Sequence, residues 1–556
     1  MRFKIFSLVS IFCLLQILAG NILWAANFNN VVATDAGKVE GIYDERYHNV
    51  KWLGIPYAAV ADGKNRWKNP QPAPAYDGVK ICDKYAPANI QFNGKQVIGK
   101  EGILTLDIYR PDTKERNLPV IVFVHGGNNQ TSNSRLWIGD KFAAEANAVY
   151  VSVQYRLGVL GFNNLSALHS GDKLADSGNY GLLDQAFALD WIKRNIAGFG
   201  GNPHNITVSG FSAGGRDVMA MLISPVFKDK FNKAISFSGG LTVADYKESQ
   251  QILAENLAPL AVEDGLFTDT DAAARWLLSD AADVREYLNK LPAERLAPVM
   301  AGAVIRMKSF PHLYADGYVL PAQGFDVKKM NSVPLLMLAS ADEFSSFVSR
   351  DPYFKNRLAK IQPGTYDGQE FAFANKYGSK LYGYFNGQEA AQKIYDHYDN
   401  DIYVCKFEFA HNPAVSGEQY VLKTGAVHGI FLPFITDQPY PYTQNTDIFQ
   451  TVGAQELSKV FTASLASFIR TGNPNNELLP QHWDKWNKKN RAEMVFDADK
   501  NSALVYLRHD ATSYDDVLQE MEADSSIKED DKQYIMHYVL NGRWFSQKLD
   551  AKYHNQ

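Results

Sequence analysis

The chain has 556 residues, of which 46% are hydrophobic and 21% charged, and its formal net charge is -5. A chain of this length can bury a large core, and single α/β domains with insertions can reach this size. The mild acidity and the lack of a basic run exclude nucleic acid or another polyanion as the expected partner.

The first residues have the pattern of an export signal. Met1 to Lys4 carry positive charge, and an apolar run follows from Ile5 to Leu18. Such a run is shorter than the roughly 20 residues that cross a bilayer. We therefore predict a signal peptide over residues 1–26 and a periplasmic or secreted protein with no membrane span in the mature chain. A retained anchor is the alternative, and Leu18 to Gly20 rivals Trp24 to Ala26 as the cleavage region.

Cysteine usage is compatible with export. Cys13 lies in the leader, so the mature chain keeps only Cys82 and Cys405. These two could form one disulfide but not a disulfide framework. Cys405 lies in the strand-like segment Tyr403 to Phe409, where a buried free thiol is the usual outcome, and we expect both thiols to be free.

Short apolar runs are spaced along the chain in the way typical of strands buried on both faces of a parallel sheet. The runs are Leu118 to Val124, Ala148 to Val153, Ile206 to Ser209 and Val333 to Ala339. Between the second and third, Leu182 to Ile196 has apolar residues at helical spacing. This order predicts an α/β fold, with a mostly parallel central sheet flanked by helices.

No repeat, low-complexity tract or linker divides the body, so we predict a single domain over residues 27–556. Helix-like stretches at about 241–330 and 350–400 are predicted helical insertions, which could form a cap. The charged, helix-patterned sequence from about residue 511 predicts a helical C-terminal extension that packs on the outside.

The pentapeptide Gly210 to Gly214, Gly-Phe-Ser-Ala-Gly, has the form of a nucleophile turn around Ser212. It follows a predicted strand and precedes a helix-compatible stretch from Arg216 to Leu222. A nucleophile on such a turn needs strained backbone angles, and the flanking glycines leave room for them. The helix dipole favours negative charge near Ser212. A glycine-rich turn without chemistry is the alternative.

The loop His125 to Asn128, His-Gly-Gly-Asn, directly follows the predicted strand Leu118 to Val124. A tetrahedral intermediate needs backbone N–H donors for its oxyanion, and a glycine-rich turn lets the main chain approach it closely. Together with the N–H of Ala213, this loop predicts an oxyanion hole. Taken alone, the loop is equally typical of an ordinary strand-to-helix connection.

A serine nucleophile needs a base, and the base needs an orienting acid. In α/β-hydrolases the acid and the histidine follow the serine in the chain. His428 lies in a loop of small residues, and His411, before Asn-Pro, is its competitor. Asp342 and Glu343 follow the fourth apolar run, at the strand end where active sites collect. Only one of two adjacent carboxylates can face the histidine, and spacing does not decide which.

Ordered matches to a known family run from about residue 30 to 510. They are Gly54 to Ala58, Arg66-Trp67, Leu106 to Tyr109, Tyr155 to Phe162, Gly178 to Gln185, Asn195-Ile196, Phe199 to Gly201 and Thr471 to Pro474. In these segments the sequence resembles the type-B carboxylesterases, which include cholinesterases, bile-salt lipases and bacterial para-nitrobenzyl esterases. The resemblance implies an α/β-hydrolase fold and carboxylic ester hydrolysis.

The resemblance also implies a set of site residues. The catalytic residues are Ser212, Glu343 and His428, and the oxyanion donors are Gly127, Asn128 and Ala213. This chemistry needs no metal and no organic cofactor, and the expected partner is a small-molecule ester. The pattern carries no indication of an oligomeric state.

Four positions depart from the family pattern. Phe211 replaces a glutamate before the nucleophile, Asn128 replaces a glycine of the oxyanion loop, Phe344 replaces the glycine after the acid, and Phe431 replaces a glutamate after the histidine. Asparagine tolerates unusual backbone angles, and only its N–H is needed. The aromatic replacements predict a more apolar floor, which affects substrate preference more than activity.

An early disulfide of the family is also missing. Its half-cystine positions correspond to Asn89 and Ile103. In cholinesterases the loop between them carries the tryptophan that holds the choline cation. Here the loop contains Phe92 but no tryptophan, which argues against a choline-ester specialist.

The leading hypothesis is a serine carboxylic ester hydrolase that acts through an acyl-enzyme. An amidase, or a hydrolase of carbamates or lactones, could use the same residues. A non-catalytic, cholinesterase-like adhesion module is the hypothesis from another class, and the intact Ser212, Glu343 and His428 weigh against it.

Overall fold

The computed structural model describes residues 28–302, 305–306, 309–439, 441 and 446–555. The predicted signal peptide, residues 1–26, lies outside these residues. In the part of the chain that is described, no helix has the length and apolar character needed to cross a membrane.

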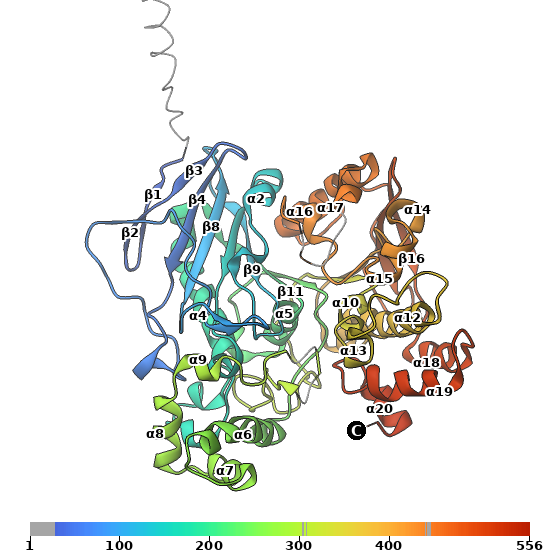
Figure 1. Cartoon of the computed structure of the whole chain (residues 1–556). Helices are drawn as coiled ribbons and strands as arrows, with labels where there is room; N and C mark the ends of the chain where they lie inside the picture. Colours follow the sequence, from blue (N-terminus) through green and yellow to red (C-terminus); the bar gives the residue numbers. More distant parts are fainter. Residues whose placement is uncertain (1–27, 303–304, 307–308, 440, 442–445, 556) are drawn as a thin grey trace, which may run out of the picture.

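An 11-stranded sheet forms the centre of the fold (Figure 1). In spatial order its strands are β16 (Ala503–His509), β15 (Ala492–Ala498), β14 (Ile402–Phe407), β13 (Leu335–Ser340), β12 (Lys233–Phe237), β11 (Gly201–Phe211), β9 (Leu118–Val124), β10 (Val149–Val153), β8 (Thr105–Pro111), β4 (Asn49–Pro56) and β3 (Ile42–Asp44). From β15 to β10 each neighbouring pair is parallel. The antiparallel pairs lie at the two ends of the sheet. The predicted α/β fold with a mostly parallel sheet is confirmed.

The continuous apolar runs form strands because both faces of the sheet are covered. The predicted strand Leu118–Val124 is β9 with the same bounds, and the other three runs overlap β10, β11 and β13. Along β9, Val120 and Val122 belong to one apolar core while Ile121 and Phe123 belong to the core on the opposite face. Strands of this kind lose the polar alternation of a half-exposed sheet.

Helices supply both covering layers. The first core contains residues of α4 (Tyr180–Asn195) and α5 (Ala213–Ile223), and the second contains residues of α2 (Asp140–Ala146), α16 (Leu432–Ile435) and α17 (Val452–Thr471). The other short helices are α3 (Gly158–Gly161), α10 (Ser345–Val348), α11 (Pro352–Lys355), α13 (Gln388–Ile394), α14 (Pro413–Ser416) and α15 (Glu418–Lys423). Two small sheets complete the fold, one of β1 (Val31–Thr34), β2 (Gly37–Glu40) and β5 (Val79–Ile81), the other of β6 (Gln91–Phe92) and β7 (Val97–Ile98).

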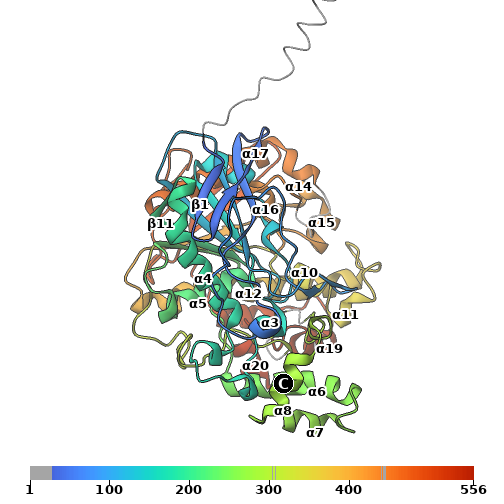
Figure 2. The ribbon, with the colours of Figure 1, turned by 90° about the vertical axis from the view of Figure 1, so that its left-hand side faces the viewer.

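The first predicted insertion is helical only in its first part. It contains α6 (Tyr246–Glu263), α7 (Thr270–Leu277), α8 (Ala282–Lys290) and α9 (Ala293–Leu296), which lie at the lower end of the molecule in Figures 1 and 2. The described residues between 297 and 334 form no α-helix and no β-strand. The second insertion is built mainly from α12 (Tyr366–Asn386).

The C-terminal extension contains α18 (Tyr514–Ala523), α19 (Glu529–Tyr534), a π-helical turn (Ile535–Val539) and α20 (Gln547–Tyr553), and it lies beside α12 in Figure 1. The extension is predicted to pack on the outside, and near its end two of its side chains also reach an apolar core. Trp544 and Phe545 are each only 2% exposed and share an apolar core with Phe344 and Tyr382. Side chains from α18, the π-helical turn after α19 and α20 belong to the same core, so apolar residues along the whole extension hold it in place.

Cys82 and Cys405 are both free and buried. At the positions of the missing family disulfide, the Asn89 side chain accepts a hydrogen bond from the backbone N–H of Ile103 (2.9 Å) and donates one to its carbonyl (2.7 Å). The pair closes the loop that carries Phe92 without a covalent bond.

Candidate active site

The predicted site residues come together at one edge of the sheet. The loop His125 to Asn128 follows β9, Ser212 follows β11 and Glu343 follows β13, all parallel strands whose carboxyl ends share that edge. His428 reaches the same place from the connection between α15 and α16.

A cavity of about 580 Å³ opens at this edge. Of the predicted site residues, Gly127, Asn128, Ser212 and His428 line it. Its other side chains include Phe92, Phe211, Phe347 and Arg350, and no carboxylate belongs to its described lining. The cavity is large enough for a small ligand.

Ser212 occupies a strained turn. Its φ and ψ are 58° and -117°, and its backbone N–H donates to the carbonyl of Phe237 (2.8 Å), which ties the turn to β12. A Cβ at Gly210 would lie 2.1 Å from the carbonyl oxygen of Gly214, and one at Gly214 would lie 2.1 Å from that of Val124. Any side chain at these two positions would clash with the backbone, so both must be glycine. Helix α5 begins directly after the serine.

The oxyanion loop also uses left-handed backbone. Gly127 and Asn128 have φ of 91° and 57°, a region that glycine and asparagine adopt most readily. Within the described chain, no hydrogen bond engages the backbone N–H of Gly127, Asn128 or Ala213. These three donors are therefore available to a ligand oxygen.

The loop is fixed from behind by a buried polar network. The Tyr155 hydroxyl lies 2.7 Å from the carbonyl oxygen of His125 and 2.8 Å from Oδ1 of Asn129. Asn129 Nδ2 donates to Asp217 Oδ1 (2.8 Å). Burial raises the pKa of Asp217 to about 6 and lowers the pKa of His125 to about 4, so His125 is neutral at physiological pH.

Glu343 and His428 form a buried acid–base pair. His428 Nδ1 shares a hydrogen bond with Glu343 Oε2, and both side chains are at most 3% exposed. The other carboxylate oxygen, Oε1, accepts from the Ser238 hydroxyl (2.5 Å) and the Ser340 backbone N–H (2.7 Å). With its proton at Nδ1, a neutral imidazole presents its lone pair at Nε2.

The opposite nitrogen, His428 Nε2, is buried and has no hydrogen-bond partner in the described chain, Ser212 Oγ included. Catalytic hydrogen bonds of this kind often tighten only when substrate binds. Ser212 and His428 nevertheless line the same cavity, so the base is available to a proton released there.

Asp342 points elsewhere and supports the histidine loop. Its Oδ2 accepts from the backbone N–H of Ala426 and from His411 Nδ1, each at 2.8 Å. Gly425 permits this close approach, since a Cβ there would lie 2.2 Å from the same oxygen. The choices that spacing left open are thus separated in space: His428 faces Glu343, whereas His411 faces Asp342.

The Asp342–His411 pair makes a testable contribution to stability. The hydrogen bond and charge of Asp342 raise the pKa of His411. A raised pKa in the folded state means that the pair stabilises the fold below the ordinary value of about 6.5, and that this stabilisation is lost as pH rises through the raised value. Because the His411 side chain is 58% exposed, we expect about 0.5 kcal/mol. Thermal unfolding of His411→Gln should show a lower Tm than wild type at pH 5.5 and little difference at pH 9; equal losses would contradict this.

Aromatic rings surround the base. The centroids of Phe211, Phe347 and Tyr382 lie 4.7, 5.4 and 5.9 Å from that of His428, and Phe431 packs against Phe211 at 5.5 Å. Of the aromatic residues that depart from the family pattern, Phe211 contacts the imidazole and Phe431 packs behind it, whereas Phe344 packs against Phe347 and Phe545.

Sequence reasoning missed Ser238, Ser340, Tyr382 and Arg216. Ser238 could have been suspected, because it follows a strand and precedes two glycines. Ser340 acts through its backbone N–H, which any residue but proline would supply, and the roles of Tyr382 and Arg216 depend on contacts between distant segments.

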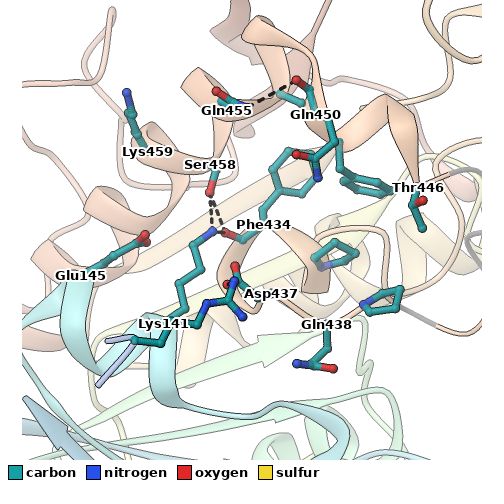
Figure 3. A pocket seen from close by; sticks show the side chains of 15 residues that line it. Lys141, Glu145, Phe434, Asp437, Gln438, Thr446, Gln450, Gln455, Ser458 and Lys459 are labelled. Atoms are coloured by element: carbon teal, nitrogen blue, oxygen red, sulfur yellow. Dashed lines mark hydrogen bonds and ion pairs between the residues drawn. The ribbon is translucent and has the colours of Figure 1, made fainter. Parts of the chain in front are cut away.

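A second cavity of about 520 Å³ lies between α2 and α17 (Figure 3). One of its two lysines, Lys141, donates to the carbonyl of Phe434 (2.8 Å) and to Ser458 Oγ (3.0 Å). The described lining of this cavity contains no histidine or cysteine, so the serine–histidine arrangement of the sheet-edge cavity is not repeated there.

The parallel sheet, the serine turn at its edge and the buried carboxylate–imidazole pair define an α/β-hydrolase. The profile of the carboxylesterase family matches residues 29–401 and 372–515. The chain belongs to this family, and its activity is carboxylic ester hydrolysis.

Individual relatives cover most of the chain. It is 27% identical to the para-nitrobenzyl esterase of Bacillus subtilis over 502 residues, which is 85% of this chain and 95% of that protein. It is 30% identical to carboxylesterase 1E of Mus musculus over 489 residues, 79% of this chain and 84% of that one. The crystal structure of a Geobacillus stearothermophilus carboxylesterase superposes with a TM-score of 0.65 at 25% identity, covering 86% of this chain and 98% of that chain.

Proposed function

We propose that this protein hydrolyses small carboxylic esters through an acyl-enzyme on Ser212, with His428 as the base and Glu343 as the orienting acid. The observation that carries the proposal is the buried hydrogen bond between His428 Nδ1 and Glu343 Oε2, beside the cavity that Ser212 lines.

In the first step, Ser212 Oγ attacks the ester carbonyl carbon while His428 Nε2 takes its proton. The carbonyl oxygen becomes an oxyanion that accepts from the N–H groups of Gly127, Asn128 and Ala213. Collapse breaks the bond to the alcohol oxygen, which leaves with the proton from His428. Water then attacks the acyl-enzyme by the same route and releases the acid.

Glu343 holds the imidazole in the tautomer that can accept the serine proton and stabilises the imidazolium that forms. The Ser238 hydroxyl and the Ser340 backbone N–H both donate to its other oxygen and hold the carboxyl group in place. General-base assistance of this kind contributes about 10²- to 10⁴-fold.

Amides, carbamates and lactones are the alternative substrates for the same residues. The rates of a nitrophenyl ester and its matched nitroanilide, compared on one enzyme preparation, separate these functions. We expect a higher kcat/KM for the ester, and a higher value for the anilide would favour an amidase. An adhesion module would hydrolyse neither compound.

The charge of the cavity predicts discrimination against cationic esters. Its described lining includes Arg350 but no carboxylate, and the loop with Phe92 supplies no tryptophan. Repulsion of about 1 kcal/mol between like charges in water corresponds to a factor of about 5 in rate. We therefore expect a choline ester to have a kcat/KM about 5-fold below that of its isostere with carbon in place of nitrogen, and salt should reduce the difference. A preference for the choline ester would show that this reading of the cavity is wrong.

A further inference from the structure

A buried arginine lies directly behind the oxyanion loop. Arg216 is on the first turn of α5, is 1% exposed, and its backbone N–H donates to the carbonyl of Ser212 (3.0 Å). Its Nη2 donates to Asn128 Oδ1 at 2.8 Å. The arginine therefore touches the loop and the nucleophile turn together.

Within the described chain, Arg216 forms no ion pair, and its Nε and Nη1 have no hydrogen-bond partner. The guanidinium keeps its charge in proteins, so a positive charge is buried here with no carboxylate in direct contact, and the neighbouring Asp217 acts on it only through space. Burying a cation in this way is costly, and structures retain such groups mainly where they serve a function.

The C-terminal extension holds the guanidinium from the other side. The Cζ atom of Arg216 lies 4.8 Å from the centre of the Trp544 ring, a distance typical of a cation–π contact. Trp544 is fixed by its neighbours: Arg543 donates to Asp351 (2.9 Å), and the carbonyl of Phe545 accepts from the Tyr514 hydroxyl (2.8 Å). The family profile ends at residue 515, so this support comes from outside the matched region.

Asn128 is clamped between two partners. Its Oδ1 accepts from Arg216, and its Nδ2 donates to Gln130 Oε1 (3.0 Å). The side chain at this left-handed position offers hydrogen-bonding groups to its neighbours, which a glycine would lack. When the Asn128 side chain is held by these two hydrogen bonds, the peptide that carries its N–H is also held, and this N–H is one of the proposed oxyanion donors.

We propose that Arg216 is a positioning residue for ester hydrolysis: braced by Trp544, it holds Asn128 so that the loop N–H groups face the oxyanion, and it places a buried positive charge behind that site. The inference rests on the proposed function of Ser212 and adds the C-terminal extension to the active site. Arg216 acts on the transition state, because negative charge develops on the substrate oxygen only there.

The test compares Arg216→Met, Arg216→Lys, Asn128→Gly and the double variant Asn128→Gly/Arg216→Met on a nitrophenyl ester. Arg216→Met should lower kcat by about 10²-fold with KM changed less than about 3-fold. Arg216→Lys should lower kcat less than Arg216→Met does, because lysine keeps the positive charge but lacks the planar guanidinium with its several N–H donors. In the Asn128→Gly background the loss from Arg216→Met should be at least about 3-fold smaller, since the two residues act through one contact.

The affinity for a trifluoromethyl ketone inhibitor is a second measurement, and it would not change if Arg216 only supported the fold. Its tetrahedral adduct with serine carries an oxyanion, so its affinity should fall in proportion to kcat/KM across the series. Arg275→Met, which changes an exposed arginine on α7, is the control and should leave both quantities unchanged. If Arg216→Met does not fold, Trp544→Phe and Arg216→Lys carry the same comparison.

The proposal is overturned if kcat and inhibitor affinity stay within about 3-fold in Arg216→Met, or if the losses from Arg216 and Asn128 simply multiply. Ser212→Ala separates this failure from that of the proposed function. An inactive Ser212→Ala beside a fully active Arg216→Met removes only the role of Arg216, whereas an active Ser212→Ala removes both.

Discussion

Ser212→Ala should reduce kcat for short-chain nitrophenyl esters by about 10⁴- to 10⁶-fold. The serine has the strained φ of a nucleophile turn and lines the cavity beside His428. Without its oxygen no acyl-enzyme can form, and only binding and the oxyanion donors remain. Steady-state kinetics with purified protein measure the effect, and a thermal unfolding curve checks that the variant folds.

Ser458→Ala is the matched control for this experiment. Ser458 lies in the second cavity, where its hydroxyl donates to the carbonyl of Phe434 (2.7 Å). Full activity of Ser458→Ala beside an inactive Ser212→Ala assigns the chemistry to the sheet-edge cavity. Retained activity in pure Ser212→Ala would disprove the assignment of the nucleophile.

Glu343→Gln should lower kcat by about 10³- to 10⁴-fold. The Ser340 backbone N–H at Oε1 can only donate, so the glutamine oxygen will occupy that position, where the Ser238 hydroxyl also donates to it. Its NH₂ group then faces His428 Nδ1 and must donate to it. The proton of the imidazole moves to Nε2, where it blocks transfer from Ser212.

Asp342→Asn is the comparison, because it makes the same change at the adjacent position. Asp342 accepts from Ala426 and His411 and does not face the base, so we expect a loss below about 10-fold. A larger fall in kcat from Asp342→Asn than from Glu343→Gln would show that Asp342, and not Glu343, is the orienting acid. Kinetics of both variants at one pH decide between them.

Much of the fold could be predicted because burial on both faces leaves a strong sequence pattern. The run Leu118–Val124 is strand β9 with the predicted bounds, and the helix predicted from Leu182 to Ile196 is α4, Tyr180–Asn195. The contacts of the C-terminal extension could not be predicted, because they depend on Trp544, Phe545 and other apolar side chains meeting partners far away in the chain.

The site shows the same division. The turn around Ser212 and the loop at Gly127 could be recognised, since each needs glycine at fixed positions. Which histidine faces Glu343 and which faces Asp342 depends on the directions of the side chains, and these cannot be predicted from the spacing of the residues in the sequence. Arg216 was overlooked as a site residue because its importance comes from a contact between helix α5 and Asn128, 88 residues earlier in the chain.

The most direct measurement of the central claim is mass spectrometry of the protein after reaction with a fluorophosphonate. The reagent phosphonylates a serine that is activated by a neighbouring base, and it mimics the tetrahedral intermediate. We expect one adduct per chain, on the peptide that contains Ser212, with no adduct in Ser212→Ala and slower labelling in Glu343→Gln. An unlabelled wild-type protein, or an adduct that persists in Ser212→Ala, would contradict the assignment of Ser212 as the nucleophile.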